Sequence, residues 1–161
     1  MNWKRLFSMQ NDLDQYINQK HNLMDQNLFQ EKYLALLVEL GELANETRCF
    51  KFWSTKPRNK KEVILEEYVD NIHFILSIGI EKGYIFESIS FEKSKLKETE
   101  QFNDVFKSCV TFYNDPTREN YIQMFQSYLQ LGNMLGFNEK DIQDAYVKKN
   151  EINYNRQQVG Y

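Results

Sequence analysis

Apolar residues recur at a helical spacing through most of this chain, and few residues interrupt the pattern. Side chains three and four positions apart share one face of an α-helix, and such runs extend over many turns here. Only six glycines and two prolines occur among the 161 residues, too few for a β-sandwich that depends on many tight turns. We therefore predict an all-α fold.

The periodic runs define six helices, which we place at 2–19, 27–48, 60–82, 98–113, 116–134 and 139–152. A polar loop around Pro57 separates the second helix from the third, and Gly83 is suited to end the third. The segment 84–97 is predicted to form a short helix and a loop. The chain contains no repeat, low-complexity segment or linker, so we expect a single domain spanning residues 1–161.

Two helix starts carry capping residues. Asp115 and Pro116 are expected to be the N-cap and the first position of the fifth helix, because proline has no N–H to leave unpaired there. Asn138 is expected to cap the last helix, with Glu139 and Asp141 in its first turn. A polar tail then follows.

Composition and charge exclude several classes of protein. The net charge is −3 and both signs are mixed along the chain, which leaves no basic surface for nucleic acid. No run approaches the roughly 18 apolar residues of a membrane-spanning helix, and the N-terminus lacks the apolar core of a signal peptide. Cys49 and Cys109 have no motif spacing and are predicted to be reduced thiols. These features predict a soluble, cytoplasmic protein.

Two pairs of acidic residues lie on the second and third predicted helices. Glu39 and Glu42 belong to the run VELGELANE, and Glu67 and Asp70 belong to EEYVDNIHF. Residues three apart point to one side of a helix, and both pairs lie about 9–15 Å from the loop that joins the two helices. If these helices pack as antiparallel neighbours, all four carboxylates converge.

Converging carboxylates repel one another unless a cation lies between them. Mg²⁺ prefers oxygen ligands and completes its shell with water and substrate phosphates. The cluster therefore indicates a magnesium and phosphate site. The alternative is that these acids are solvated faces of surface helices, but their apolar neighbours Val38, Leu40 and Val69 favour partial burial, which an unpaired acid tolerates poorly.

Four segments resemble the dimeric dUTPases, a family within the MazG-like all-α nucleoside triphosphate pyrophosphatases. They are LFSMQNDLDQYI near the N-terminus, ALLVELGELANETRCFKFW, EEYVDNIHFILSIGIEKGY, and AYVKKNEINYNRQQVGY at the C-terminus. The acidic pairs are shared by all MazG-like proteins, whereas the C-terminal pattern is far more specific. The resemblance spans nearly the whole chain and implies a MazG-like helical bundle.

The resemblance implies roles for particular residues. Glu39, Glu42, Glu67 and Asp70 would hold two or more Mg²⁺ ions, for which Mn²⁺ can substitute, and one of the first pair, Glu39 in preference to Glu42, would orient or deprotonate the attacking water. The implied substrate-binding residues are Gln10, Asp14, Lys51, Trp53, Asn71, Phe74, Lys149, Asn150, Asn153 and Arg156.

These substrate-binding residues would divide the nucleotide between them. Gln10 and Asp14 would lie near the base, although the family often has Asn in place of Asp14, and Trp53 would wall the uracil pocket. Asn71 and Phe74 would lie beside the deoxyribose, where Phe74 would exclude a 2′-hydroxyl. The basic residues Lys149 and Arg156 would bind phosphates, and two asparagines of the tail would contact sugar or base, Asn150 and Asn153.

The implied reaction is the hydrolysis of dUTP to dUMP and pyrophosphate, with dUDP as a further substrate. The resemblance also implies a homodimer of phage or bacterial origin. Two alternatives stay open: a MazG-like pyrophosphatase specific for dCTP or a modified deoxynucleotide, and a helical protein-interaction module. Some phage-borne members are thought to engage a repressor, and a repressor partner is compatible with catalysis.

Overall fold

The structure is a computed structural model that describes residues 1–86 and 94–160. These residues form six α-helices and no strand: α1 (Trp3–Lys20), α2 (Phe29–Thr47), α3 (Lys61–Lys82), α4 (Glu98–Asn114), α5 (Arg118–Met134) and α6 (Glu139–Gln158). The all-α prediction is therefore confirmed. The first four helices begin and end within two residues of the predicted positions.

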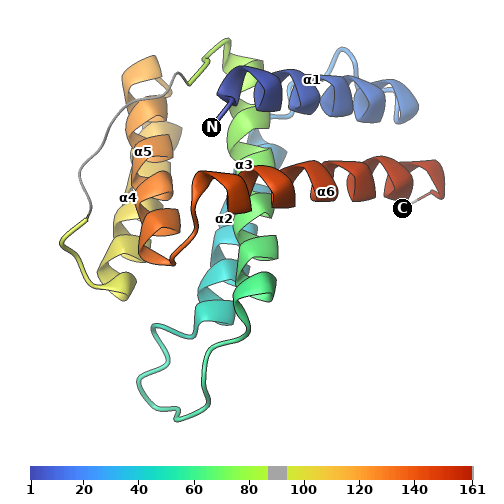
Figure 1. The fold of residues 1–161 in the computed structure, drawn as a ribbon. Helices are drawn as coiled ribbons and strands as arrows, with labels where there is room; N and C mark the ends of the chain where they lie inside the picture. Colours follow the sequence, from blue (N-terminus) through green and yellow to red (C-terminus); the bar gives the residue numbers. More distant parts are fainter. Residues whose placement is uncertain (87–93, 161) are drawn as a thin grey trace.

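Helix α3 is the centre of the arrangement, because it contacts α1, α2, α5 and α6. Helices α2 and α3 form a hairpin whose long loop projects away from the rest of the molecule (Figure 1). Helices α4 and α5 form a second pair beside it, and α1 and α6 run side by side across α3 (Figure 1). Residues from both ends of the chain therefore lie against the middle of α3.

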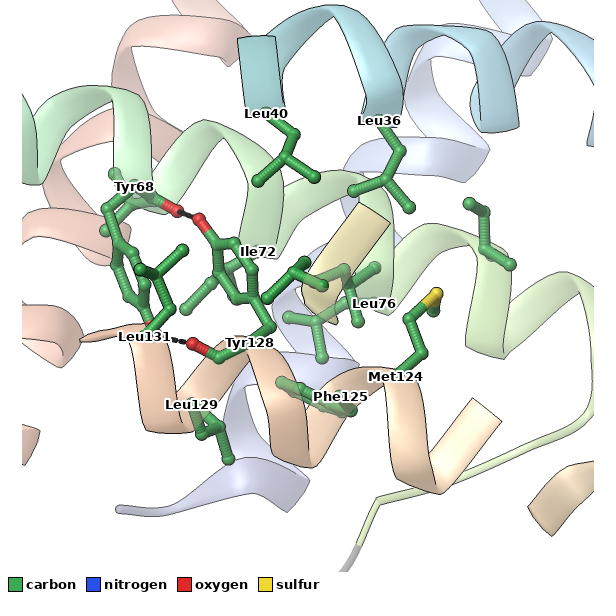
Figure 2. Close-up of a cluster of buried hydrophobic side chains, with 14 of the residues drawn as sticks. Leu36, Leu40, Tyr68, Ile72, Leu76, Met124, Phe125, Tyr128, Leu129 and Leu131 are labelled. Carbon is green, nitrogen blue, oxygen red and sulfur yellow. Dashed lines mark hydrogen bonds between the residues drawn. The ribbon is translucent and has the colours of Figure 1, made fainter. Parts of the chain in front are cut away.

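The apolar core contains side chains from all six helices, and part of it lies where α2, α3 and α5 meet. Figure 2 shows Leu36 and Leu40 pointing from α2 toward Ile72 of α3, and Tyr128 reaching toward them from α5 on the opposite side. The hydroxyl groups of Tyr68 and Tyr128 each donate to the backbone carbonyl of the other residue, at 3.3 and 2.7 Å. The two rings stack 4.6 Å apart. This packing fixes α3 against α5 and holds the α2–α3 hairpin in place.

The start of α5 differs from the prediction. Its N-cap is Thr117, whose hydroxyl accepts a hydrogen bond from the backbone N–H of Asn120. Asp115 is instead the C-cap of α4, and Asn120 reaches back to its carbonyl oxygen at 2.7 Å. Asp and Thr are both good N-cap residues, and Thr117, which lies nearer to the helix than Asp115, caps it. The assignment of Pro116 to the first helical position is wrong.

Helix α6 continues to Gln158, six residues beyond the predicted end at 152. No glycine or proline interrupts the tail before Gly160, so nothing opposes further helix formation. Half of the predicted short helix and loop at 84–97 falls on residues 87–93, which lie outside the described residues, and the flanks 84–86 and 94–97 are not helical.

Two further expectations concern the cysteines and the membrane. Cys49 and Cys109 are free thiols, as predicted. In the described part of the chain, none of the helices combines the length and the hydropathy needed to cross a bilayer.

Candidate active site

The two acidic pairs meet where α2 packs against α3. Carboxylate oxygens of Glu39, Glu67 and Asp70 all lie within 4.8 Å of one another. Each of the three side chains is partly buried, whereas Glu42 is exposed and outside this group. The hairpin geometry therefore brings three of the four predicted carboxylates together, and we call Glu39, Glu67 and Asp70 the acid cluster.

Burial and mutual repulsion make ionisation of the acid cluster unfavourable. Burial, followed by the charges of Asp70, Glu42 and Glu67, raises the pKa of Glu39 to about 7. Burial, followed by the charges of Asp70 and Glu42, also raises the pKa of Glu67. Glu42 therefore acts on the cluster through its charge, from a position close to it.

A lysine from α6 contacts one side of the acid cluster. The ammonium group of Lys149 lies 2.7 Å from Asp70 and 3.0 Å from Glu66. The Lys149 side chain is only 8% exposed. Burial raises the pKa of Asp70, and the hydrogen bond from Lys149 opposes this shift. Lys149 therefore neutralises part of the charge that α2 and α3 place here.

The donor set fits a hard divalent cation. Three carboxylate oxygens within 4.8 Å of one another are of the ligand type that Mg²⁺ prefers. Their raised pKa values show that the folded chain holds negative charge at a cost, and a cation would remove that cost. Glu39, Glu67 and Asp70 are the residues that could hold it.

A cavity of about 540 Å³ opens beside the acid cluster, between α1, α2, α3 and α6. This volume is within the usual range for a small-molecule site. Glu39 and Asp70 lie in its wall, so the cluster and the cavity form one site. Five of the predicted substrate-binding residues also line it: Gln10, Asp14, Phe74, Asn153 and Arg156.

The far end of the cavity contains a network of hydrogen-bonded polar side chains. Gln10 donates to Asp14 at 2.7 Å, and Ser77 donates to the other oxygen of Asp14 at 2.5 Å. The side-chain oxygen of Gln10 lies 2.7 Å from both His73 and the Tyr146 hydroxyl. Burial raises the pKa of Asp14, while the hydrogen bond from Ser77 and the charge of Lys32 oppose the shift.

The other five predicted substrate-binding residues do not line this cavity. Trp53 is 65% exposed in the loop between α2 and α3, and Lys51 lies over the Phe50 ring in the same loop. Asn71, Lys149 and Asn150 are buried near it. Asn71 donates to the backbone carbonyl of Glu67 at 3.1 Å. Their predicted roles in substrate binding therefore remain predictions.

Several residues of the site were not predicted from the sequence, namely Lys32, His73, Ser77 and Tyr146. A signal for two of them was present. Asp70, His73 and Ser77 are spaced three and four residues apart in a largely apolar stretch of α3, which places them on one face. Lys32 carries positive charge to the cavity wall, where it lies 2.8 Å from Glu81 and 3.8 Å from Asp14.

Comparison with known proteins shows the family of the chain. A family model described as dUTPase matches residues 2–161. No curated protein matches the chain. The match extends over all six helices, including both that carry the acid cluster and the two that bring the chain ends to the cavity. The chain therefore belongs to the all-α dUTPase family and is a hydrolase of the dUTP diphosphatase type.

Proposed function

We propose that the protein hydrolyses dUTP to dUMP and pyrophosphate in a reaction that depends on Mg²⁺. The observation that carries this proposal is the meeting of the acid cluster with the cavity, since Glu39 and Asp70 belong to both. A nucleotide that enters the cavity would bring its phosphates to the carboxylates while its base reached the polar network. The triphosphate and the metal ligands would then share one end of the site.

The acid cluster would hold Mg²⁺ through Glu39, Glu67 and Asp70, with Glu42 close by. When bound, Mg²⁺ would neutralise phosphate oxygens and lower the pKa of a bound water. Beside the bound cation Glu39 would be ionised and could act as the general base. Its carboxylate would accept a proton from the water that forms the new bond to the α-phosphorus, while the bond to the leaving pyrophosphate breaks.

Positive charge beside the acid cluster would bind the phosphates. Arg156 lines the cavity, and its planar fork of donors suits two phosphate oxygens at once. Lys32 lines the same cavity from α2, and Lys149 lies beside Asp70. Two helices, α2 and α6, would therefore supply cations to a chain of negative net charge.

The other end of the cavity would bind the nucleoside. At a base edge, the Gln10 amide would offer an N–H donor and the Asp14 carboxylate would offer an acceptor. Phe74 lines the cavity one turn after Asp70 on α3, where its ring would stand against the sugar and exclude a 2′-hydroxyl. Asn153 lines the cavity from α6 and would contact sugar or base.

The exposed loop between α2 and α3 supports a homodimer. Phe52 is 93% exposed and packs edge-on against Trp53 with ring centroids 4.9 Å apart. Leu34 and Val38, four residues apart on α2, are also exposed. Large apolar side chains grouped in this way suit a protein contact. We propose that a second copy of the chain covers them, and that Lys51 and Trp53 approach the nucleotide in that assembly.

Release of pyrophosphate from each deoxynucleoside triphosphate, with Mg²⁺ or with EDTA, tests the proposal. We expect the fastest release from dUTP, and release only with Mg²⁺; UTP, dCTP and dTTP serve as comparisons, and dUDP is tested for phosphate release. Pyrophosphate from dCTP at the same rate as from dUTP would contradict the substrate assignment and leave the pyrophosphatase assignment intact. Hydrolysis that persists in EDTA would contradict the metal requirement.

A pair of variants on α3 tests the acid cluster. Glu67→Gln removes one charge of the cluster and should abolish turnover while the apo protein stays as stable or becomes more stable, because repulsion is relieved. Glu62→Gln makes the same chemical change at an exposed position in the first turn of α3 and should leave turnover unchanged. Equal activity of the two variants would show that the acid cluster does not support catalysis.

A further inference from the structure

We propose that His73 and Tyr146 are positioning residues that fix the side-chain amide of Gln10, so that its N–H group faces the cavity. The proposal rests on the function proposed above. In this orientation, the Gln10 N–H selects a pyrimidine with a carbonyl at position 4 over one with an amino group there. Neither residue needs to touch the base, because each acts through Gln10.

The Gln10 side-chain oxygen receives two hydrogen bonds. The Tyr146 hydroxyl donates to it at 2.7 Å, and Nδ1 of His73 lies 2.7 Å away on α3. A carbonyl oxygen has two lone pairs, so this oxygen is fully used. It is therefore held inside the protein and has no lone pair left for a ligand.

The Gln10 nitrogen lies toward Asp14. Its distance to the Asp14 carboxylate is 2.7 Å, and the other carboxylate oxygen accepts from Ser77 at 2.5 Å and lies 3.8 Å from Lys32. Rotating the Gln10 amide by half a turn would set its oxygen against this carboxylate and its nitrogen against a hydroxyl and an imidazole. Asp14 therefore opposes the flipped amide.

This arrangement determines the protonation of His73. Because the Gln10 oxygen can only accept, Nδ1 of His73 carries the hydrogen, and Nε2 is unprotonated. Nε2 is buried and has no hydrogen-bond partner among the described residues. Burial lowers the pKa of His73 to about 3, so the ring is neutral and the Nδ1–H tautomer persists.

The positioning side chains are themselves held firmly. Tyr146 is fully buried and His73 is 5% exposed. Their rings stack 4.2 Å apart at an interplanar angle of 17°. Gln10 is 3% exposed and still lines the cavity. An amide in this setting has no room to adjust to a different ligand.

The consequence is a fixed donor at the base end of the cavity. A primary amide nitrogen carries two hydrogens, and only one of them is used by Asp14 among residues 1–86 and 94–160. The second can pair with the 4-carbonyl of uracil. Cytosine presents an amino group at that place, and two donors facing each other leave buried polar groups unpaired, which is costly.

The test compares hydrolysis of dUTP and dCTP by the dimer or monomer as purified, through the ratio of their kcat/KM values. We expect Tyr146→Phe, which removes only the hydroxyl, to lower this ratio at least about tenfold. His73→Phe keeps the ring stack, removes the Nδ1 donor, and should lower the ratio similarly. Tyr128→Phe is the matched control, because it removes a buried hydroxyl that donates to a backbone carbonyl away from the cavity.

Long-range ¹H–¹⁵N spectra of the wild-type imidazole give a readout that does not depend on activity. We expect the Nδ1–H tautomer for His73, and an Nε2–H tautomer would overturn the proposal, because it would require a flipped Gln10. If Tyr146→Phe and His73→Phe both leave the dUTP to dCTP ratio of kcat/KM unchanged, with dUTP still preferred, the positioning role alone is overturned. Equal hydrolysis of dUTP and dCTP by the wild type would overturn both this proposal and the dUTP assignment.

Discussion

The ammonium group of Lys149 lies 2.7 Å from a carboxylate oxygen of Asp70, although the two residues come from α6 and α3. Both side chains are largely covered, at 8% and 15% exposure. The contact connects the C-terminal helix to the acid cluster. The ammonium group of Lys149 therefore offsets part of the negative charge of the acid cluster in the metal-free protein. It also lies beside the place that we propose for a substrate phosphate.

Lys149→Met should destabilise the metal-free protein by about 2 kcal/mol, because Asp70 would lose a charged hydrogen bond in a covered place. The same variant should bind Mg²⁺ more tightly, since one positive charge leaves the site. Urea denaturation and calorimetric titration measure the two effects. Lys148→Met is the control, because Lys148 is adjacent to Lys149 but exposed. This variant should change stability by less than about 0.5 kcal/mol. Weaker Mg²⁺ binding by Lys149→Met would contradict this account.

The contribution of Glu39 to the stability of the metal-free protein should fall as pH rises through the neutral range. The pKa of Glu39 is raised from 4.5 to about 7 in the folded state, so the folded chain holds this proton more tightly than the unfolded chain does. The resulting stabilisation is complete below pH 4.5 and is lost as pH rises through 7. Glu67 shifts in the same direction and adds to the effect.

Chemical denaturation of the metal-free protein from pH 5 to pH 8 measures this dependence. The buried, neutral His73 acts in the opposite sense, because its pKa is lowered from 6.5 to about 3 and its contribution to stability grows as pH rises. The effect of Glu39 is therefore the difference between wild type and Glu39→Gln, whose amide has no proton to lose. Saturating Mg²⁺ should remove the loss of stability that Glu39 causes, since a bound cation favours the ionised carboxylates and releases protons. The stability of metal-free wild type relative to Glu39→Gln should fall as pH rises, and a rise would refute the assignment of a raised pKa to Glu39.

The helices and the acid cluster could be predicted because both follow from local rules. Helix α3 carries apolar residues at a 3.6-residue period, and the i, i+3 spacing of Glu67 and Asp70 places both on one side. Packing α2 against α3 in a hairpin then brings Glu39 to them. The start of α5 was predicted wrongly because Asp115 and Thr117 are both good caps, and only the packed structure decides between them.

The polar network and the Lys149 contact could not be predicted in the same way. Gln10, His73 and Tyr146 come from α1, α3 and α6, so their hydrogen bonds exist only once three helices have packed. Sequence spacing says nothing about which polar residue of one helix meets which of another. A lone histidine in an apolar helix is compatible with simple packing, and only its 2.7 Å distance to Gln10 shows its place in the site.

Close packing around Tyr68 should make Gly132 intolerant of a side chain. A Cβ at Gly132 would lie 2.3 Å from the Tyr68 hydroxyl oxygen and 2.5 Å from the ring carbon that bears it. Tyr68 is fully buried and stacked on Tyr128, so it has nowhere to move. Gly132→Ala should therefore lower stability by about 1–3 kcal/mol through overpacking.

Gly41→Ala is the matched control for that substitution. A Cβ at Gly41 would meet no atom within 4 Å, and the residue lies inside α2. Alanine is the better helix former, so this variant should gain about 0.4–1 kcal/mol. Urea denaturation of both variants checks the contrast. Equal stabilities would mean that α3 and α5 pack less closely at Tyr68 than the structure has them.

Phe74 should control the choice of sugar without affecting the choice of base. Its half-buried ring lines the cavity between Asp70 and Ser77 on α3, away from the hydrogen bonds that hold Gln10. An apolar wall rejects an added hydroxyl only modestly, by about 100-fold. Phe74→Ala should therefore raise kcat/KM for UTP relative to dUTP by at least about tenfold, and the ratio of dUTP to dCTP should stay as in wild type.

Phe106→Ala separates this effect from a general loss of packing. Phe106 of α4 is also half-buried against the core but lies outside the cavity. Both variants lose apolar contacts and should be less stable, whereas only Phe74→Ala should admit UTP. If both variants relax the sugar choice equally, the discrimination comes from the rigidity of the whole bundle. If neither does, another residue of the cavity excludes the 2′-hydroxyl, and Asn153, which lines the cavity from α6, is the next to test.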